Sequence, residues 1–477
     1  MSETNEQETN EQETTPQESQ QTEDAPALPV TESAADAETG STTEPDTSEA
    51  TGTTVVVGVN VGATKTTSAT STGGIESEVL SLRYDNLDTV MPSCLSFPGS
   101  SGGFRKFGDA AECDHGNDSN KFTHLLYLPH DKDQHDTFRS SVLCTSNLQT
   151  ADKGEENNKT EDVVFELQPT GPDGNVENLP STAIPARQAL AMFLRKLYQR
   201  AVKERSENNS EESSQPSFVC SLNAPSCFSE SHKARLCSAA RVAGFSAARV
   251  TTNVEALAAV YLNRRVLPSA DSTEFPFLVA FVDYGHAQFS VGIAAFYKPN
   301  AESTPTYRVL SEHSVVGFAG ESIDLALAQH FAQQYAAKVN AQPVGLTSRK
   351  GKRLVRACRG AKHALSANEK ARFMVDAMGE NGDDARFEVT RSDFSKHCEV
   401  QFAALRDALT TVFNSVFSAG VRHCYLLDCS ICPLFVRCCE IDNDTAIHVV
   451  QLSPKPRRLK WMVSPSSSNA LIFVKWS

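Results

Sequence analysis

The sequence predicts an α/β fold built from a duplicated unit, because strands alternate with helices twice along the chain. Two apolar runs, Val55–Val61 and Phe277–Asp283, each predict a buried strand followed by a polar hairpin. At the junction, each run has an acid or its amide followed closely by glycine, at Asn60–Gly62 and at Asp283–Gly285. Glycine lets a backbone approach phosphate closely, and a carboxylate holds a metal ion or its water. Two such units facing each other would form a two-lobed phosphate clamp.

The negative charge of the chain is concentrated near its N-terminus. The 477 residues carry a formal net charge of −15, but residues 1–52 hold 14 Asp and Glu with no Lys or Arg, which leaves −1 for the remainder. Acidic, low-complexity sequence of this kind predicts a disordered tail, either solubilising or docking on a basic partner. The nearly neutral remainder has no general attraction for nucleic acid, so we expect no specific nucleic-acid partner.

The sequence contains no recognisable targeting or membrane segment. The N-terminal region lacks the basic and apolar parts of a signal peptide. No apolar stretch approaches the roughly 20 residues that a membrane span needs. Thirteen cysteines without framework spacing are typical of reduced thiols. We therefore expect a cytoplasmic protein with no membrane partner.

The first globular half is predicted to span residues 53–267. After the opening hairpin, residues 162–180 predict another hairpin and residues 186–202 a helix. Ser229 and Gly244 mark the two ends of a further predicted helix. The apolar face of the 186–202 helix consists of Leu190, Phe193, Leu194, Leu197, Tyr198, Ala201 and Val202. The other predicted elements are strands at 218–222 and 248–252 and a helix at 254–265.

The second globular half is predicted to span residues 275–439. After its hairpin comes a strand at 307–316, and Gly320 then precedes a helix with apolar residues four apart. Fewer than 40 residues follow Cys439, and we expect residues 440–477 to form a short C-terminal tail. The remaining predicted elements are helices at 352–367 and 402–416 and a strand at 423–429.

Six segments occur in a characteristic order between residues 53 and 436. They are VVVGVNVGATKT, MPSCLSFPG with RKFGDAAE, LNAPSCFSESHKARLCSAARVAGFSAARVTTNVEALAA, VDYGHAQFSVGIAAF, AGESIDLALAQHF and RACRGAKHALSAN. Together they resemble the nucleotide-binding domain of the seventy-kilodalton heat shock protein (Hsp70) family. The resemblance implies the actin-like ATPase fold, with residues 53–267 as lobe I and residues 275–439 as lobe II around a nucleotide cleft.

Two segments resemble atypical branches of that family. KFTHLLYLPHDKD is similar to the member that pairs with a J-domain partner at the ribosome, and VDYGHAQFSVGIAAF is similar to the large exchange-factor relatives. Active members continue into a β-sandwich that grips peptides and a helical lid. The residues after Cys439 are too few for such a sandwich, so we expect none.

The resemblance implies a degraded first phosphate loop. The family's aspartate, glycine and two threonines fall on Asn60, Gly62, Ala63 and Thr64. An amide cannot replace the charge of a carboxylate that holds magnesium-bound water. Ala63 lacks the hydroxyl that meets the terminal phosphate. Gly62 and Thr64 remain as candidate nucleotide contacts.

Two further catalytic positions of lobe I are also altered. The family's lysine, which polarises the γ-phosphate, falls on Leu125, and Lys121 lies about one helical turn away as a possible replacement. The family's glutamate falls on Val254, whereas Glu255 comes one residue later and would point about 100° away on a helix.

The second phosphate loop keeps little of the family pattern. Asp283 and Gly285 match the first acid and one glycine, while two glycines, the threonine and the second acid are lost. The residues at the lost positions are His286, Ala287, Gln288 and Ser290. His286 and Ala287 add Cβ atoms where the backbone would approach phosphate.

The adenosine side of the cleft is partly retained. Gly320, Lys362 and Ser366 match the family's glycine, lysine and serine, and His363 replaces the arginine that stacks on the base. The closing double glycine is replaced by Asp428–Cys429, and that carboxylate would repel phosphate.

We therefore predict no catalytic residue and no metal ligand. The loss of charged groups predicts that hydrolysis is lost, because phosphoryl transfer depends on metal and positioned charge. Two interpretations of the cleft remain open: weak ATP binding without a dependable magnesium site, or glycines that serve the fold alone. The candidate cofactor-binding residues are Gly62, Thr64, Asp283, Gly285, Gly320, Lys362, His363 and Ser366.

Two other patterns have alternative interpretations. Cys429–Cys432 with nearby cysteines has zinc-like spacing, but only one clean pair exists and cysteine is also a common core residue. The cationic run Ser348–Lys362 predicts either a solvated helix face or a contact for ribosomal RNA or an acidic partner.

The leading hypothesis is a noncatalytic or weakly ATP-binding Hsp70-like protein that acts as a regulatory subunit or co-chaperone in protein folding. Its expected partners are a J-domain protein or an active heat-shock chaperone, with the ribosome as a further candidate. The alternatives are an ATP-dependent chaperone with an unusual cleft and a binding module resembling nucleotide-exchange factors.

Overall fold

The computed structural model describes the chain between residues 53 and 476 in ranges separated by gaps. These ranges are 53–72, 79–84, 88–97, 104–113, 120–130, 149–150, 163–167, 182–208, 216–264, 276–298, 304–379, 382–417, 424–428, 447–451 and 470–476. They all belong to one compact unit, residues 52–477. The predicted tail at 1–52 and the turn at 171–174 lie outside the described residues.

The first sheet has the strand order β12-β11-β1-β2-β3, with β4 also pairing with β2. β1 pairs antiparallel with β2, as the first predicted hairpin requires, and parallel with β11, which is parallel to β12. The strands are β1 (Thr54–Val61), β2 (Lys65–Ser71), β3 (Leu80–Ser81), β4 (Val90–Pro92), β11 (Ser217–Ala224) and β12 (Ala247–Thr252).

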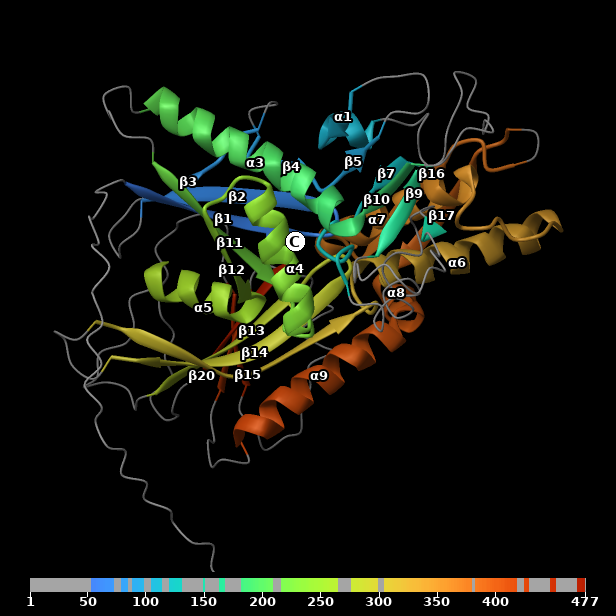
Figure 1. The fold of residues 1–477 in the computed structure, drawn as a ribbon. Helices are drawn as coiled ribbons and strands as arrows, with labels where there is room; N and C mark the ends of the chain where they lie inside the picture. The colour runs from blue at the N-terminus through green and yellow to red at the C-terminus, as the bar shows by residue number, and fades with distance from the viewer. Residues whose placement is uncertain are drawn as a thin grey trace, which may run out of the picture. The chain divides into compact units, whose positions relative to one another are not determined.

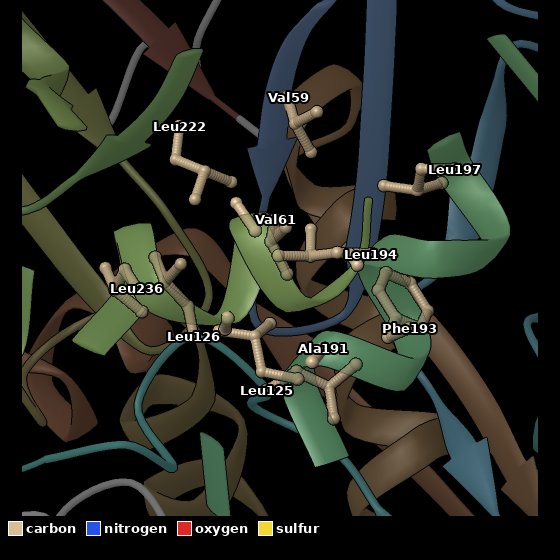
Figure 2. Packing of buried hydrophobic residues seen from close by; sticks show 14 of the residues in the cluster. Val59, Val61, Leu125, Leu126, Ala191, Phe193, Leu194, Leu197, Leu222 and Leu236 are labelled. Atoms are coloured by element: carbon tan, nitrogen blue, oxygen red, sulfur yellow. The ribbon is translucent and has the colours of Figure 1, made fainter. Parts of the chain in front are cut away.

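Buried and more exposed residues alternate along β1, and the buried ones mark the face of the sheet that helices cover. Val55, Val57, Val59 and Val61 are buried, while the residues between them are half-exposed. The buried side chains pack against α3 (Ala186–Asn208) and α4 (Glu230–Val242), which lie over the same face (Figure 1). Figure 2 shows Val59 and Val61 beside leucines from both helices.

The predicted features of α3 and α4 are confirmed. The apolar face of α3 lies in the first core, with Leu190, Leu194 and Leu197 fully buried. Ser229 caps α4 by accepting a hydrogen bond from the backbone N–H of His232 at 3.1 Å. Gly244 follows the helix with φ +113°, a conformation that a side chain strongly disfavours.

The second sheet repeats the plan of the first. Its order is β15-β14-β13-β18-β19, with β20 also pairing with β13. Here too an antiparallel hairpin, β13–β14, is followed by parallel pairing of its first strand, to β18. The strands are β13 (Phe277–Tyr284), β14 (Gln288–Tyr297), β15 (Thr306–Val316), β18 (Cys424–Asp428), β19 (Ile447–Gln451) and β20 (Ala470–Trp476). The duplicated α/β architecture is therefore confirmed.

Strands β19 and β20 come from the segment predicted as a C-terminal tail. β19 pairs parallel with β18, and β20 pairs parallel with β13. Both segments are short runs of β-forming residues, IHVVQ and ALIFVKW, which suit addition to a sheet.

Helices cover the second sheet as well. α9 (Glu399–Phe417) packs on β14 and β15, and α6 (Gly320–Val339) packs against α7 (Arg349–Ala367) (Figure 1). α5 (Asn253–Arg264) contacts strands of both sheets and so joins the two halves of the unit. No helix in the described ranges is both long and apolar enough to traverse a bilayer.

Smaller elements complete the unit. β9 and β10 form the predicted hairpin after residue 162. β16 and β17 form a hairpin that the sequence reasoning did not predict. The bounds are α1 (Asp109–Glu112), β5 (Leu95–Ser96), β6 (Lys106–Phe107), β7 (Lys121–Phe122), β8 (Gln149–Thr150), β9 (Val164–Leu167), β10 (Thr182–Pro185), β16 (Lys370–Val375), β17 (Ala385–Thr390) and α8 (Arg391–His397).

Candidate functional site

The two predicted phosphate loops are tight turns with the same hydrogen bond. In the β1–β2 turn, Gly62 N–H donates to Lys65 O at 2.9 Å, and in the β13–β14 turn Gly285 N–H donates to Gln288 O at 2.9 Å. A Cβ added to Gly62 would lie 2.7 Å from Lys65 O, too close for any side chain. Thr64 contributes its carbonyl, which accepts from Ser93 N–H at 2.9 Å. The turn itself therefore requires Gly62.

Three polar side chains, one of them from the second turn, come together at these turns. His124 Nε2 is 3.1 Å from Glu321 Oε2, and His286 Nε2 is 3.9 Å from Glu321 Oε1. The two imidazole rings stack, with centroids 6.2 Å apart and planes at 25°. All three side chains are about nine-tenths buried or more. We call His124, His286 and Glu321 the His–His–Glu cluster.

Backbone hydrogen bonds fix the cluster to both turns. His124 N–H donates to Ala63 O in the first turn at 3.4 Å, and His286 itself belongs to the second turn. Glu321 N–H donates to His286 O at 2.7 Å. Next to His286, the Ala287 side chain is buried in the first hydrophobic core, among residues of β1 and α3. The cluster therefore lies at both of the turns that the sequence predicts to meet phosphate.

A second polar group joins α6 to α7. Lys362 Nζ is 2.6 Å from Asp324 Oδ1 and donates to Gly320 O at 2.9 Å. Arg359 Nε donates to Asp324 Oδ2 at 3.0 Å, and its terminal nitrogen is 3.0 Å from His286 Nε2. Gly320 N–H donates to Gly285 O at 3.1 Å. The structure thus brings together Gly285, Gly320 and Lys362 from the predicted set.

Burial and local charge set the protonation of these groups. Burial lowers the pKa of His286 to about 3, although the Glu321 carboxylate opposes the shift. Burial alone would raise the pKa of Glu321, but its ion pair and hydrogen bond with His124 outweigh burial and lower it. Burial lowers the pKa of Lys362, against the raising effect of Asp324. At neutral pH, His286 is therefore neutral and Glu321 is ionised.

The remaining predicted contacts are more peripheral. Asp283 is half-buried at the end of β13, where its charge adds to the effect of burial in raising the pKa of Tyr127. His363 and Ser366 are exposed on α7, and Ser366 contributes its carbonyl to Arg391 at 3.4 Å. β18 ends at Asp428, and Cys429 lies outside the described residues.

Leu125 and Lys121 do not supply a catalytic cation. Leu125 is fully buried in the first core, beside residues of β1 and α3 (Figure 2). Lys121 Nζ donates to the carbonyl of Glu112 at 3.1 Å, at the end of α1. In this structure the lysine amine is therefore directed to a helix end.

Glu255 caps its own helix. Its carboxylate accepts from Thr252 N–H at 2.9 Å, and Glu255 N–H donates to Thr252 Oγ1 at 3.2 Å, which together form a capping box. Val254, which occupies the family's glutamate position, is buried against Gly292 of β14. Neither residue is placed to activate water.

Neutral groups replace carboxylates at the ends of β1 and β14. Asn60 Oδ1 accepts from Asn223 Nδ2 at 3.2 Å, and Asn223 also bonds Asn253 at 3.1 Å. Ser290 Oγ lies 2.7 Å from Ser314 Oγ and accepts from Asn253 Nδ2 at 3.2 Å. Side-chain amides and hydroxyls thus satisfy one another in this region.

Three features of these residues bear on how well magnesium–ATP would fit. The first acid is an amide, and the Lys362 charge is already matched by Asp324 at 2.6 Å. The His–His–Glu cluster places a carboxylate between the two turns, where it would repel phosphate. The described residues named here are held by hydrogen bonds and packing within the protein.

The sequence reasoning missed His124, Glu321, Asp324 and Arg359. A detectable signal existed for the last three. Glu321 and Asp324 lie three apart at the start of α6, as Arg359 and Lys362 do on α7, so each pair shares a helix face. The cationic run is consequently split: Lys362 is buried and Arg359 is half-exposed, both paired with Asp324, while Lys352 and Arg356 are exposed. His124 had no comparable signal.

Comparison with known proteins identifies the family. A family model described as "Hsp70 protein" matches residues 158–419, more than half of the chain. A heat shock protein homolog of Naumovozyma castellii is 28% identical over 204 residues, which cover 43% of this chain and 27% of that protein. A heat shock protein homolog of Saccharomyces cerevisiae is 29% identical over 194 residues, covering 40% of this chain and 26% of that protein.

A human relative matches to a similar extent. "Heat shock 70 kDa protein 4L" of Homo sapiens is 28% identical over 228 residues, which cover 48% of this chain and 25% of that protein. The chain thus spans about a quarter of the length of the curated relatives it matches. The family model and the duplicated sheets agree, and the chain belongs to the Hsp70 family, which has the actin-like ATPase fold and generally binds nucleotide.

Proposed function

We propose that this protein is a noncatalytic member of the Hsp70 family that regulates an active heat-shock chaperone during protein folding in the cytoplasm. The observation that carries the proposal is the His–His–Glu cluster, which links the two turns where the family places phosphates. In this proposal the cluster competes with nucleotide for the cleft, and the working surface is the outside of the lobes.

The chemistry of hydrolysis supports this assignment. Phosphoryl transfer needs a metal and cations that stabilise the developing charge of the transferred group. Asn60 offers an amide in place of a carboxylate, Leu125 offers a buried methyl group in place of an amine, and Glu255 is used as a helix cap. Each of these changes alone impairs catalysis, and together they remove the magnesium site, the cation and the activated water.

ATP binding, in this proposal, is weak and independent of magnesium. Binding would have to open the pair between His124 and Glu321 and to compete with Asp324 for Lys362. A ligand that must first displace internal contacts loses that free energy from its affinity. The resident hydrogen bonds therefore hold nucleotide occupancy low at ordinary ATP concentrations.

The proposed partners are an active heat-shock chaperone and its J-domain protein, with the ribosome as a further candidate. A stable regulatory complex needs exposed surface rather than an open cleft. α7 contributes Lys352 and Arg356 to such a surface, while its inward face is used by the Asp324 pairs. These exposed cations suit an acidic patch on a protein or the backbone of ribosomal RNA.

The decisive experiment measures refolding of a denatured client by an active Hsp70 and a J-domain protein, with and without this chain. A change in refolding yield supports the proposal. The Asn60→Asp variant is the matched control, because it returns a carboxylate to the first turn without altering the outer surface. The Asn60→Asp protein should change the refolding yield as much as the wild type does.

Two outcomes would overturn the proposal. Turnover of ATP by the purified chain when a J domain is added would make it an active chaperone with an unusual cleft. Absence of any effect on refolding, together with no capture of a chaperone, J-domain protein or ribosome, would leave no regulatory role. Acceleration of ADP release alone would place the protein with exchange-factor-like binding modules.

A further inference from the structure

We propose that the His–His–Glu cluster is a binding site for a divalent transition-metal ion, with zinc as the best-suited ion. The proposal rests on three side chains from separate segments whose ligand atoms converge in a buried place. One potential ligand atom from each of His124, His286 and Glu321 lies within 4.8 Å of the others. Within the described ranges, this is the group of such residues that meets metal-like spacing.

The distances suit a small ion at the centre. Zinc bonds to imidazole nitrogen and carboxylate oxygen are about 2.0–2.2 Å, so ligand atoms of a tetrahedral site lie roughly 3.3–3.5 Å apart. His124 Nε2 is 3.1 Å from Glu321 Oε2, and His286 Nε2 is 3.9 Å from the other oxygen, Oε1, so an ion would be met by both oxygens or by one of them after the carboxylate turns. Small rotations of the side chains are therefore enough to close the site around an ion.

The chemistry of the ligand set favours zinc over magnesium or calcium. Two imidazoles and one carboxylate form a known zinc set, whereas magnesium and calcium prefer oxygen ligands alone. Three protein ligands leave a fourth position for water or another small ligand.

Neighbouring groups orient the ligands. Thr123 Oγ1 is 3.0 Å from His124 Nδ1. When the Thr123 hydroxyl accepts from Nδ1–H, the Nε2 lone pair of His124 is available to a metal. The metal would then take the place of the contact between His124 Nε2 and Glu321 Oε2.

Arg359 is the group that opposes binding. Its terminal nitrogen is 3.0 Å from His286 Nε2, and its charge repels a cation. Metal binding requires this contact to break, but Arg359 keeps its bond to Asp324 through Nε at 3.0 Å. The Arg359→Met variant should therefore bind zinc more tightly than the wild type, a result that a purely structural cluster does not predict.

The site would join the two halves of the unit. His124 follows β7 in the first half, whereas His286 and Glu321 belong to the second half. A bound ion would cross-link them and raise the melting temperature of the full chain. The site does not depend on the proposed regulatory role, since metal binding is measured on the purified protein without any chaperone.

The test is a zinc titration of the metal-free full chain in competition with a chromophoric chelator, supported by cobalt as a spectroscopic probe. We expect one ion per chain, a rise in melting temperature and a cobalt spectrum of nitrogen and oxygen ligands. His124→Asn, His286→Gln and Glu321→Gln should each weaken zinc binding by at least the 10- to 100-fold that loss of an outer-shell partner costs.

A matched control uses another stacked pair of histidines. His330 and His397 stack with centroids 3.7 Å apart, outside the cluster, and the double variant His330→Asn/His397→Asn should keep full zinc affinity. Circular dichroism of each variant verifies that it is folded. Zinc binding that survives the three cluster variants, a thiolate-to-cobalt charge-transfer band, or wild-type binding no stronger than that of the Glu321→Gln variant would each overturn the proposal.

Discussion

Lys362 Nζ lies 2.6 Å from Asp324 Oδ1, and the two side chains are only 6% and 0% exposed. This pair occupies the position from which the family's lysine would reach a nucleotide. Because the charge is matched inside the protein, Lys362 stabilises the contact between α6 and α7. A residue that matches a family motif has therefore become part of the core.

Lys362→Met should destabilise the protein substantially. Breaking a buried pair by removing one partner costs about 3–5 kcal/mol, and the retained Arg359 bond to Asp324 favours the lower end. Urea unfolding measures the change. The control is Arg372→Met in the exposed Arg372–Glu388 pair, which should leave stability unaltered. Equal losses in the two variants would show that the buried pair has no special role.

Asn60→Asp should not restore hydrolysis. The carboxylate can keep the hydrogen bond from Asn223, so the variant should fold, but Leu125 and the His–His–Glu cluster remain. Release of phosphate from ATP, measured with a J domain present, should stay at background. Phosphate release well above background would mean that the Asn60 amide is the one change that prevents hydrolysis.

Gly62→Ala should destabilise the protein even without nucleotide. The added Cβ would lie 2.7 Å from Lys65 O, and overpacking of this kind costs about 1–3 kcal/mol. Gly360→Ala is the matched control, since its Cβ would meet nothing within 4 Å inside α7, and alanine gains about 0.5–1 kcal/mol there. Thermal and urea unfolding should move in opposite directions for the two variants.

Glu321→Ala should loosen the contact between the two turns. It removes the partner of His124 Nε2 and leaves a buried imidazole without that bond, which costs about 1–3 kcal/mol. Hydrogen exchange at the His124 amide, which now donates to Ala63 O, should become faster. Unchanged exchange there would indicate that packing alone holds the turns together.

Stability should fall in alkaline solution because of buried thiols. Burial raises the pKa of Cys358 from 9.0 to about 12, so between those values the unfolded chain releases a proton that the folded chain keeps. Stability therefore decreases as pH rises, by about 1.4 kcal/mol per pH unit for each such thiol. Burial raises the pKa of Cys398 in the same way.

The measurement is the free energy of unfolding between pH 8 and pH 10.5 under reducing conditions. Cys358→Ala should flatten the decline, and Cys113→Ser, at an exposed position, should not. An identical slope in all three proteins would contradict the assignment. Because Cys113 is exposed and Cys358 is buried, Cys113 should react with thiol reagents in the native state and Cys358 should not.

Local patterns predicted most of the fold. Each of these patterns involves residues close together in the sequence, and each is confirmed. They are the alternating valines of β1, the helical spacing of apolar residues in α3, and the capping residues Ser229 and Gly244 of α4. The β16–β17 hairpin was missed although its signal is local: apolar residues alternate in both strands, and Gly379 and Gly382 lie between them.

The candidate site was less predictable. Gly285, Gly320 and Lys362, predicted as nucleotide contacts from the family pattern, lie together, and their binding role stays a prediction. The partners that neutralise Lys362 and fill the cleft come from other segments. His124 and Glu321 are 197 residues apart, and their contact exists only once both sheets are assembled. The other nucleotide contacts stay predictions.

The burial of Ala287 has a mechanical consequence. This methyl group belongs to the second turn yet is embedded among side chains of the first core. Neither half can unfold or move apart without exposing the Ala287 methyl group. Calorimetry should therefore show one cooperative unfolding transition rather than two. Ala287 therefore couples the unfolding of one half to the unfolding of the other.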